Sequence, residues 1–136
     1  MTQKDKELLM KDLCARLPYG VKVESVFINP NTKEHKSCRI EVFDAISILM
    51  IRDGLGEFKP YLFPLSSITE EQKSYINGRW GVNGHFEFEI DPLWEEYFVD
   101  LSDAVEFINW CYENHFDING LIPRGLAEDA TDKNIY

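Results

Sequence analysis

Two pairs of metal-binding residue types stand out in the sequence, His35-x-x-Cys38 and Cys111-x3-His115. A cysteine and a histidine four positions apart share one face of a helix, and structural zinc takes four such ligands. Cys111 also falls on the apolar side of a helical pattern, where a buried free cysteine is common. The two pairs stand too far apart in sequence for a short zinc finger. The pattern therefore favours a structural role for Cys111, and we assign no metal ligand.

His115 and Asp117 have the residue types of a general base and of the carboxylate that orients it. Cys14 or Cys38 would then be the candidate nucleophile, although nothing in the sequence places either one near His115. A histidine at a helix end is also favoured by the helix dipole and by the free carbonyl groups there. We therefore expect His115 and Asp117 to tie down a helix end, and we assign no catalytic residue.

Nucleotide and hydrolase motifs are absent from the sequence. Gly54-Leu55-Gly56 lacks the third glycine of a dinucleotide-binding loop, because position 59 is a lysine. There is no G-x-x-x-x-G-K, no H-E-x-x-H and no G-x-S-x-G pattern. We therefore assign no cofactor.

The net charge of −10 is concentrated in the second half of the chain. Residues 1–68 hold ten Lys/Arg and nine Asp/Glu, a net charge of +1, whereas residues 69–136 hold four Lys/Arg and fifteen Asp/Glu, a net charge of −11. Such a half would repel nucleic acid, whose binding needs clustered positive charge. It is either a solvated face that keeps the protein soluble or a surface that docks on a basic protein partner. The candidate partner-binding residues are Glu87, Glu89, Asp91, Glu95 and Glu96.

The elements that must position these residues follow from hydrophobic periodicity and turn signals. The apolar run 46–51 reads as a central strand, and Pro60 and Pro64 place 58–65 at a sheet edge. Capping boxes are expected at Thr2/Asp5 and Thr69/Gln72, and Ser102 as the cap of the last helix. The predicted helices are 3–17, 69–78 and a last one that ends near His115; the predicted strands are 21–29, 38–43, 46–51 and 85–91. The fold class is α+β, with a small, mostly antiparallel sheet of about four to six strands and N-terminal, central and C-terminal helices.

The length of 136 residues fits a single globular domain, and residues 128–136 are expected to form a flexible tail. Within residues 114–127, Asn119-Gly120 and Pro123-Arg124-Gly125 are turn signals, so Leu121 and Ile122 are expected to close the core as a lid. Three scattered cysteines do not form a disulfide framework, and no apolar run has the length of a membrane span. These features predict a reduced cytoplasmic protein.

Three stretches carry a resemblance: "LLMKDLCARLPYGVKV" (8–23), "FKPYLFPLSSITEEQ" (58–72) and "INWCYENHFDINGLIPRGLA" (108–127). Together they resemble a family of short uncharacterised proteins from gut Bacteroidetes and their phage or mobile elements. That resemblance implies a bacterial cytoplasmic setting and favours a non-enzymatic role; it brings no site residues with it.

We therefore expect a non-enzymatic protein-interaction module that meets a basic partner through its acidic half. The alternative is a small hydrolase or metal-dependent enzyme centred on His115 and Asp117.

Overall fold

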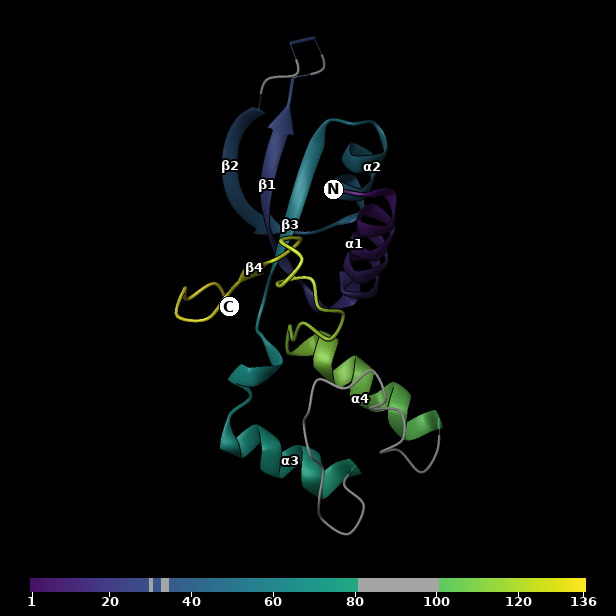
Figure 1. Ribbon diagram of the computed structural model, residues 1–136, viewed down its shortest axis with the longest axis vertical. Coiled ribbons are helices and arrows are strands. Elements are labelled where there is room, and N and C mark those ends of the chain that lie inside the picture. The colour runs from purple at the N-terminus through teal and green to yellow at the C-terminus, as the bar shows by residue number, and fades with distance from the viewer. Residues whose placement is uncertain (30, 33–34, 81–100) are drawn as a thin grey trace.

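The computed structural model describes residues 1–29, 31–32, 35–80 and 101–136 of the chain. It confirms the α+β class: among these residues there are four α-helices and a four-stranded, mostly antiparallel sheet (Figure 1). The predicted strand 85–91 and the acidic residues from Glu87 to Glu96 lie outside the described residues. In chain order the elements are α1 (Gln3–Ala15), β1 (Lys22–Ile28), β2 (His35–Val42), α2 (Ala45–Arg52), β3 (Gly56–Leu62), α3 (Glu70–Trp80), α4 (Leu101–Glu113) and β4 (Glu128–Asp129).

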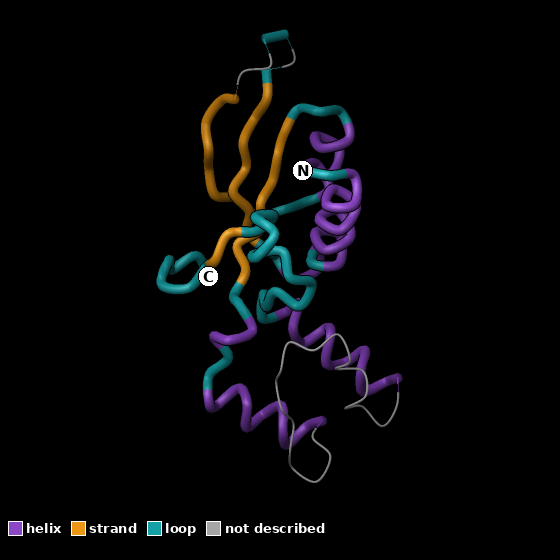
Figure 2. The backbone as a smooth tube through the Cα atoms, in the orientation of Figure 1, coloured by secondary structure: helices purple, strands orange, loops and turns teal. Residues whose placement is uncertain are grey.

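The sheet has the strand order β2-β1-β3-β4, in which β1 pairs antiparallel with both β2 and β3 (Figure 2). The last strand, β4, is short and parallel, and it pairs only with Tyr61 and Leu62 of β3. Val21 just before β1, Val23 of β1 and Phe58 of β3 are buried. They form a core with Leu9 and Leu13 of α1. One face of the sheet is therefore closed by the N-terminal helix.

The prediction of a central strand at 46–51 is wrong, because this run lies within the helix α2. Asp44 caps the helix: its carboxylate accepts a hydrogen bond from the Ser47 backbone N–H at 3.0 Å, and the Ser47 hydroxyl accepts one from the Asp44 N–H. A continuous apolar run has no period that separates a strand from a helix. The capping box at Asp44 and Ser47 favours the helix. Two of its apolar side chains, Ile46 and Leu49, are exposed.

The first and third helices begin as predicted. Thr2 and Asp5 form a reciprocal capping box at α1, and Thr69 and Gln72 do the same at α3. The predicted end of α3 at Gly78 is wrong, because the helix continues to Trp80, a buried residue. Local capping therefore sets where α1 and α3 start. At the other end of α3, the two residues beyond Gly78 include Trp80, whose side chain is packed in the interior.

The last helix differs from its prediction in its start. It begins at Leu101, so Ser102 lies inside the helix and is not its cap. The buried side chains are Ala104, Phe107 and Cys111, whereas Val105 is exposed. This stripe packs with Ile76 and Trp80 of α3 in a second core, separate from that under the sheet. Figure 1 shows α3 and α4 together in the lower part of the molecule, with the sheet, α1 and α2 above.

Residues 114–130 join the two parts and close the first core. Leu121 is fully buried, Leu126 and Ala127 are buried with it, and Ile122 packs against the same cluster, as the predicted lid requires. Gly120 and Gly125 supply the two turns, each with a positive φ angle near 70°. The predicted tail at 128–136 makes defined contacts with the sheet, because it contains β4 and Ala130, whose N–H donates to the Leu62 carbonyl at 2.8 Å.

Candidate functional site

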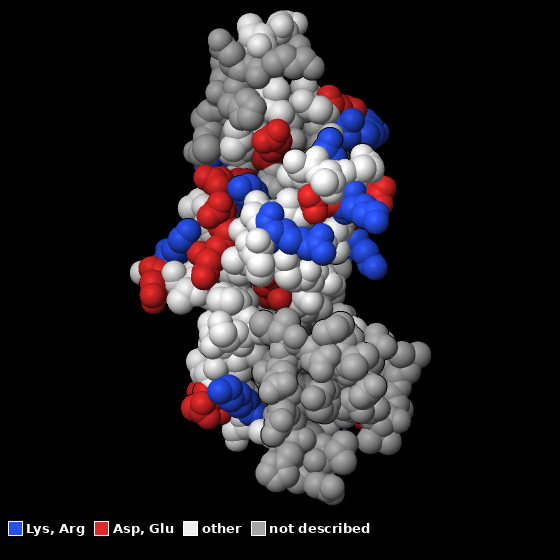
Figure 3. Space-filling model, viewed as in Figure 1, with Lys and Arg blue, Asp and Glu red and all other residues white. Residues whose placement is uncertain are grey.

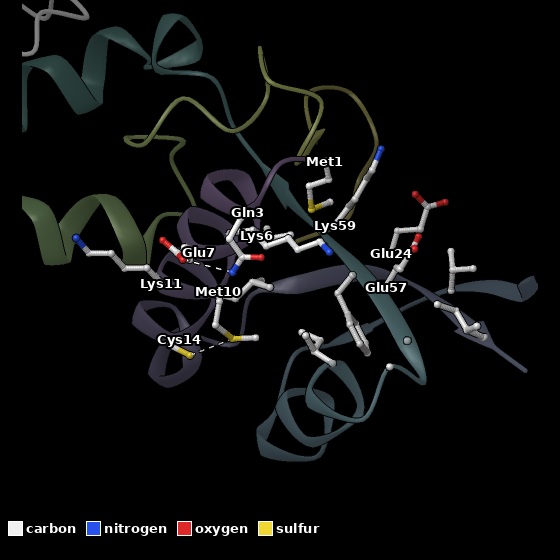
Figure 4. A pocket seen from close by; sticks show the side chains of 18 residues that line it. Met1, Gln3, Lys6, Glu7, Met10, Lys11, Cys14, Glu24, Glu57 and Lys59 are labelled. Carbon is white, nitrogen blue, oxygen red and sulfur yellow. Dashed lines mark hydrogen bonds between the residues drawn. The ribbon is translucent and has the colours of Figure 1, made fainter. Parts of the chain in front are cut away.

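A groove of about 950 Å³ lies between α1 and the first half of β3. Figure 4 shows α1 supplying one wall, with Gln3, Lys6, Glu7, Met10, Lys11 and Cys14, and the strands supplying the other, with Glu24, Glu57 and Lys59. Its apolar lining includes Leu9, Leu13, Val26, Ile51 and Phe58. A mostly apolar concavity with a few charged groups at its rim is typical of a binding site.

In the described part of the chain, no strand pairs with the edge of β3 that forms one wall of the groove. β1 pairs with residues 56–60 of β3 on one side, whereas on the other side β4 reaches only Tyr61 and Leu62. Figures 1 and 2 show α1 on the side of β3 away from β1, which is the side of this edge. Within the described residues, the edge 56–60 therefore faces the groove without a strand partner.

The hydrogen bonds at both ends of β3 identify which backbone groups face the groove. The Leu55 carbonyl accepts from the Ile28 N–H, so it points toward β1, whereas the Leu62 carbonyl points outward and accepts from Ala130. Along an antiparallel strand, the N–H and carbonyl groups of successive residues point alternately to one neighbouring strand position and to the other. Gly56 and Phe58 therefore turn their backbone groups toward the groove, whereas Pro60, on the same side of the strand, is fully buried and does not line it. Proline has no N–H to donate, which suits an outward position at an edge.

Gly56 is required at the start of β3 by the packing around it. A Cβ atom at this position would lie 2.9 Å from Cε2 of the Phe58 ring and 3.6 Å from Cε of Met50. A contact below 3 Å forces one of the groups to move, and Phe58 is buried in the core. The glycine thus keeps the Phe58 ring in its place in the floor of the groove.

The α1 wall combines soft and basic side chains. The exposed Cys14 thiol lies 3.7 Å from the sulfur of Met10, one turn earlier on the helix. Lys6 reaches from α1 toward β3 in Figure 4. The face drawn in Figure 3 carries Lys and Arg mainly on the side of α1, and Asp and Glu mainly on the side of β4. Within the groove itself, α1 contributes Lys6, Glu7 and Lys11, and the strands contribute Glu24, Glu57 and Lys59.

β3 contributes one acidic and one basic side chain to the strand wall, Glu57 and Lys59, on the sheet face opposite Phe58. Glu57 is exposed and has no ion pair or hydrogen bond from its side chain among the described residues. Lys59 lies opposite Glu24 on β1, and its ammonium is 3.9 Å from the Glu128 carboxylate. Among the described residues of this edge, the Glu57 carboxylate is therefore available to pair with a basic side chain of a bound molecule.

A second group of polar side chains, centred on Asp12 and Arg16, is buried at the junction of α1 with the segment after α4. The Arg16 guanidinium donates to Asp12 through Nε at 2.6 Å and Nη2 at 3.1 Å, and Nη2 also donates to the Phe116 carbonyl at 2.7 Å. Asn119 donates to Asp12 at 2.8 Å, and Arg16 lies over the Tyr112 ring. Both charged side chains are fully buried. This group holds α1 against residues 112–119.

Asp117 does not orient His115 for catalysis. Its two carboxylate oxygens accept the backbone N–H groups of Leu121 and Ile122, at 2.8 and 2.9 Å. The His115 ring instead stacks on Tyr136 with a centroid distance of 3.8 Å, and its Nδ1 is buried without a hydrogen-bond partner in the described part of the chain. Burial, together with the charges of Arg16 and Lys22, lowers the pKa of His115 to about 4. The ring is thus held neutral in a packed position.

The Tyr136 hydroxyl is inserted between two strands of the sheet. It accepts a hydrogen bond from the Lys22 N–H at 2.9 Å and donates one to the Tyr61 carbonyl at 2.7 Å. These two backbone groups would otherwise pair directly in the β1–β3 ladder. Burial raises the pKa of this hydroxyl to about 12, so it stays protonated and able to donate.

The four residues of the sequence-predicted zinc pattern are not brought together. His35 and Cys38 belong to β2 in the upper part of Figure 1, whereas Cys111 lies on α4 in the lower part, with His115 just after it. Burial also raises the pKa of the Cys111 thiol to about 12, which opposes the thiolate that zinc requires. Within the described ranges, no group of three or more His, Cys, Asp or Glu side chains could hold a metal ion.

Sequence reasoning missed the groove, although one signal pointed to it. Pro60 and Pro64 predicted a sheet edge at 58–65, and residues 56–60 are such an edge. The α1 wall could not be found, because residues 3–14 meet β3 only through the fold. The candidate acidic face, Glu87, Glu89, Asp91, Glu95 and Glu96, lies outside the described residues.

Comparisons with protein-family models, with curated proteins and with solved structures find no match. Among the described helices, none combines the length and the apolar character that a membrane crossing requires.

Proposed function

We propose that this chain is a non-enzymatic protein-interaction module that holds a segment of a partner protein in the groove between α1 and β3. The observation that carries the proposal is an apolar groove with a strand edge along one wall that is unpaired among the residues that the structure describes. An apolar cavity of this kind buries a partner's side chains, and an open edge recognises its backbone. These are properties of a protein-binding surface.

The acidic second half of the chain, residues 69–136, indicates that the partner is basic. With a net charge of −11 over residues 69–136, the chain attracts a basic protein and repels nucleic acid. Glu87, Glu89, Asp91, Glu95 and Glu96 are the proposed contacts outside the groove. The cytoplasmic setting and the relation to short proteins of gut Bacteroidetes and their mobile elements remain part of this proposal.

The alternative, an enzyme centred on His115 and Asp117, gains no support from their contacts. Both Asp117 oxygens are used in capping backbone N–H groups, and the accessible ring face of His115 is covered by Tyr136. A general base must reach the proton that it removes. These two side chains are arranged to hold the helix end.

The test is affinity capture from a bacterial lysate with matched variants. Met10→Glu places a charge in the apolar groove wall, and Val105→Glu places the same charge on an exposed site of α4. The proposal expects a captured protein that is lost with Met10→Glu and retained with Val105→Glu. It also expects weaker capture when Glu87, Glu89, Glu95 and Glu96 are changed to lysine.

Capture that is unchanged by Met10→Glu would contradict the role of the groove. Circular dichroism and the urea midpoint of each variant show that a loss of capture does not come from unfolding.

A further inference from the structure

The free part of the β3 edge has defined limits. It begins at Gly56, directly after the turn at Gly54 that follows α2, and it ends where β4 pairs with Tyr61. The groove follows it from Gly54 to Lys59. An added strand would be short, because Pro60 is fully buried and β4 occupies the same edge beyond it.

The backbone groups of this edge specify an extended chain. Gly56 and Phe58 line the groove, and each has an N–H and a carbonyl on that side. An antiparallel strand would exchange two hydrogen bonds with Phe58 and two with Gly56. Pro60 has no N–H and is fully buried, so the strand gains no hydrogen bond there.

The two sides of such a strand meet different surroundings. Side chains on the side of Phe58 enter the groove against Leu9, Met10 and Leu13, so they must be apolar. Side chains on the opposite side lie beside Glu57 and Lys59. Oppositely charged side chains that face each other across two strands stabilise the pair, and like charges destabilise it.

The charge of Glu57 selects a basic residue in the partner. Lys59 already lies beside Glu24 and Glu128, whereas the Glu57 carboxylate has no partner within the described residues. The residue opposite Glu57 is then Lys or Arg, in agreement with the negative charge of the whole chain.

We propose that the groove takes an extended segment of a basic protein, which adds to β3 as an antiparallel strand, with alternate apolar residues facing α1 and a Lys or Arg facing Glu57. This inference rests on the proposed protein-interaction function and names the chemistry of the partner segment. The occupant is a different protein, since a second copy of the chain would bring its own net charge of −10 to the same edge.

The experiment uses capped peptides as probes and the whole protein as receptor. The peptides are Val-Thr-Val-Lys-Val, its charge-reversed form Val-Thr-Val-Glu-Val and the rearranged Val-Lys-Val-Thr-Val. Each is titrated to several millimolar, and binding is followed through the amide NMR signals of Gly56 and Phe58. The receptors are the wild type, Glu57→Lys and, as a control of equal charge change, Glu113→Lys at the exposed end of α4.

The wild type is expected to bind Val-Thr-Val-Lys-Val at least about threefold more tightly than the glutamate peptide, and Glu57→Lys to reverse this preference. Glu113→Lys should keep the wild-type preference. The rearranged peptide should bind more weakly, because an antiparallel strand then places its lysine opposite Lys59.

Equal binding of the two charged peptides, no binding of either, or a preference unchanged in Glu57→Lys would overturn the proposal. Signals of Gly56 and Phe58 that move with protein concentration alone would assign the edge to a second copy and would also overturn it. If the peptides fail while lysate capture still depends on Met10, the strand-addition inference falls and the protein-interaction function stands.

Discussion

Replacing Asp12 with alanine should remove a large part of the stability of this protein. The Arg16 guanidinium would remain fully buried, with the Phe116 carbonyl and the Tyr112 ring as its partners. Breaking a buried ion pair from one side typically costs about 3–5 kcal/mol, because the remaining charge is desolvated and poorly compensated. A domain of this size is stable by about 5–15 kcal/mol in total, so the loss is readily measured.

The size of the effect distinguishes this pair from an exposed one. Arg52 and Asp53 also form an ion pair, at 3.0 Å, but both side chains are at least half exposed. Asp53→Ala should therefore cost less than about 1 kcal/mol. Asp12→Asn should lie between the two alanine variants, since the amide oxygen still accepts one hydrogen bond from Arg16.

Urea unfolding followed by tryptophan fluorescence gives the free energy of unfolding for each variant. A double variant, Asp12→Leu with Arg16→Met, should recover most of the loss, because apolar residues of similar size often replace a buried pair at little cost. If Asp12→Ala costs no more than Asp53→Ala, the pair is not buried as described and the reasoning is wrong.

Three further predictions concern His115, Gly56 and Tyr136. Burial lowers the folded pKa of His115 to about 4, below its ordinary value of 6.5, so the folded state binds fewer protons between these pH values and stability should fall as pH drops through them. In His115→Asn, which tolerates the positive φ angle, the urea midpoint should depend less on pH in this range. Gly56→Ala should destabilise the protein by about 1–3 kcal/mol, because the added Cβ displaces the Phe58 ring. Gly78→Ala, where the added Cβ meets open space, should be neutral or stabilising. Thermal unfolding of both variants checks this contrast. Tyr136→Phe should cost about 1–3 kcal/mol and speed hydrogen exchange of the Lys22 amide, since its bridging hydroxyl is lost; an unchanged exchange rate would contradict the bridge.

The parts of the fold that were predictable from sequence are those fixed by neighbouring residues. Two helix starts were predictable from the pairs Thr2/Asp5 and Thr69/Gln72, because a capping box is made by residues three positions apart. The run 46–51 was misassigned since its apolar side chains have no period, although Asp44 and Ser47 have the same spacing as the other caps. The buried side of α4 depends on Trp80 and Ile76, which only the fold brings to it.

The candidate site was less predictable, because its residues meet through tertiary contacts. Asp12 and Arg16 have the spacing of an ordinary exposed helix pair, and nothing in the sequence indicates that both are buried. Met10 and Cys14 lie on one side of α1, but the strand edge opposite them is some forty residues later. Only Pro60 and Pro64 indicated that edge, because neither has a backbone N–H to donate to a neighbouring strand.

Hydrogen exchange at Phe58 tests the role of the β3 edge most directly. In the isolated protein the Phe58 amide, which has no strand partner among the described residues, should exchange faster than the Lys59 amide, which points toward β1. Addition of a bound partner or of the Val-Thr-Val-Lys-Val peptide should slow exchange at Phe58 and leave Lys59 unchanged. A Phe58 amide that is already protected in the isolated protein, or one whose exchange is unaffected by a bound partner, would contradict the proposed binding edge.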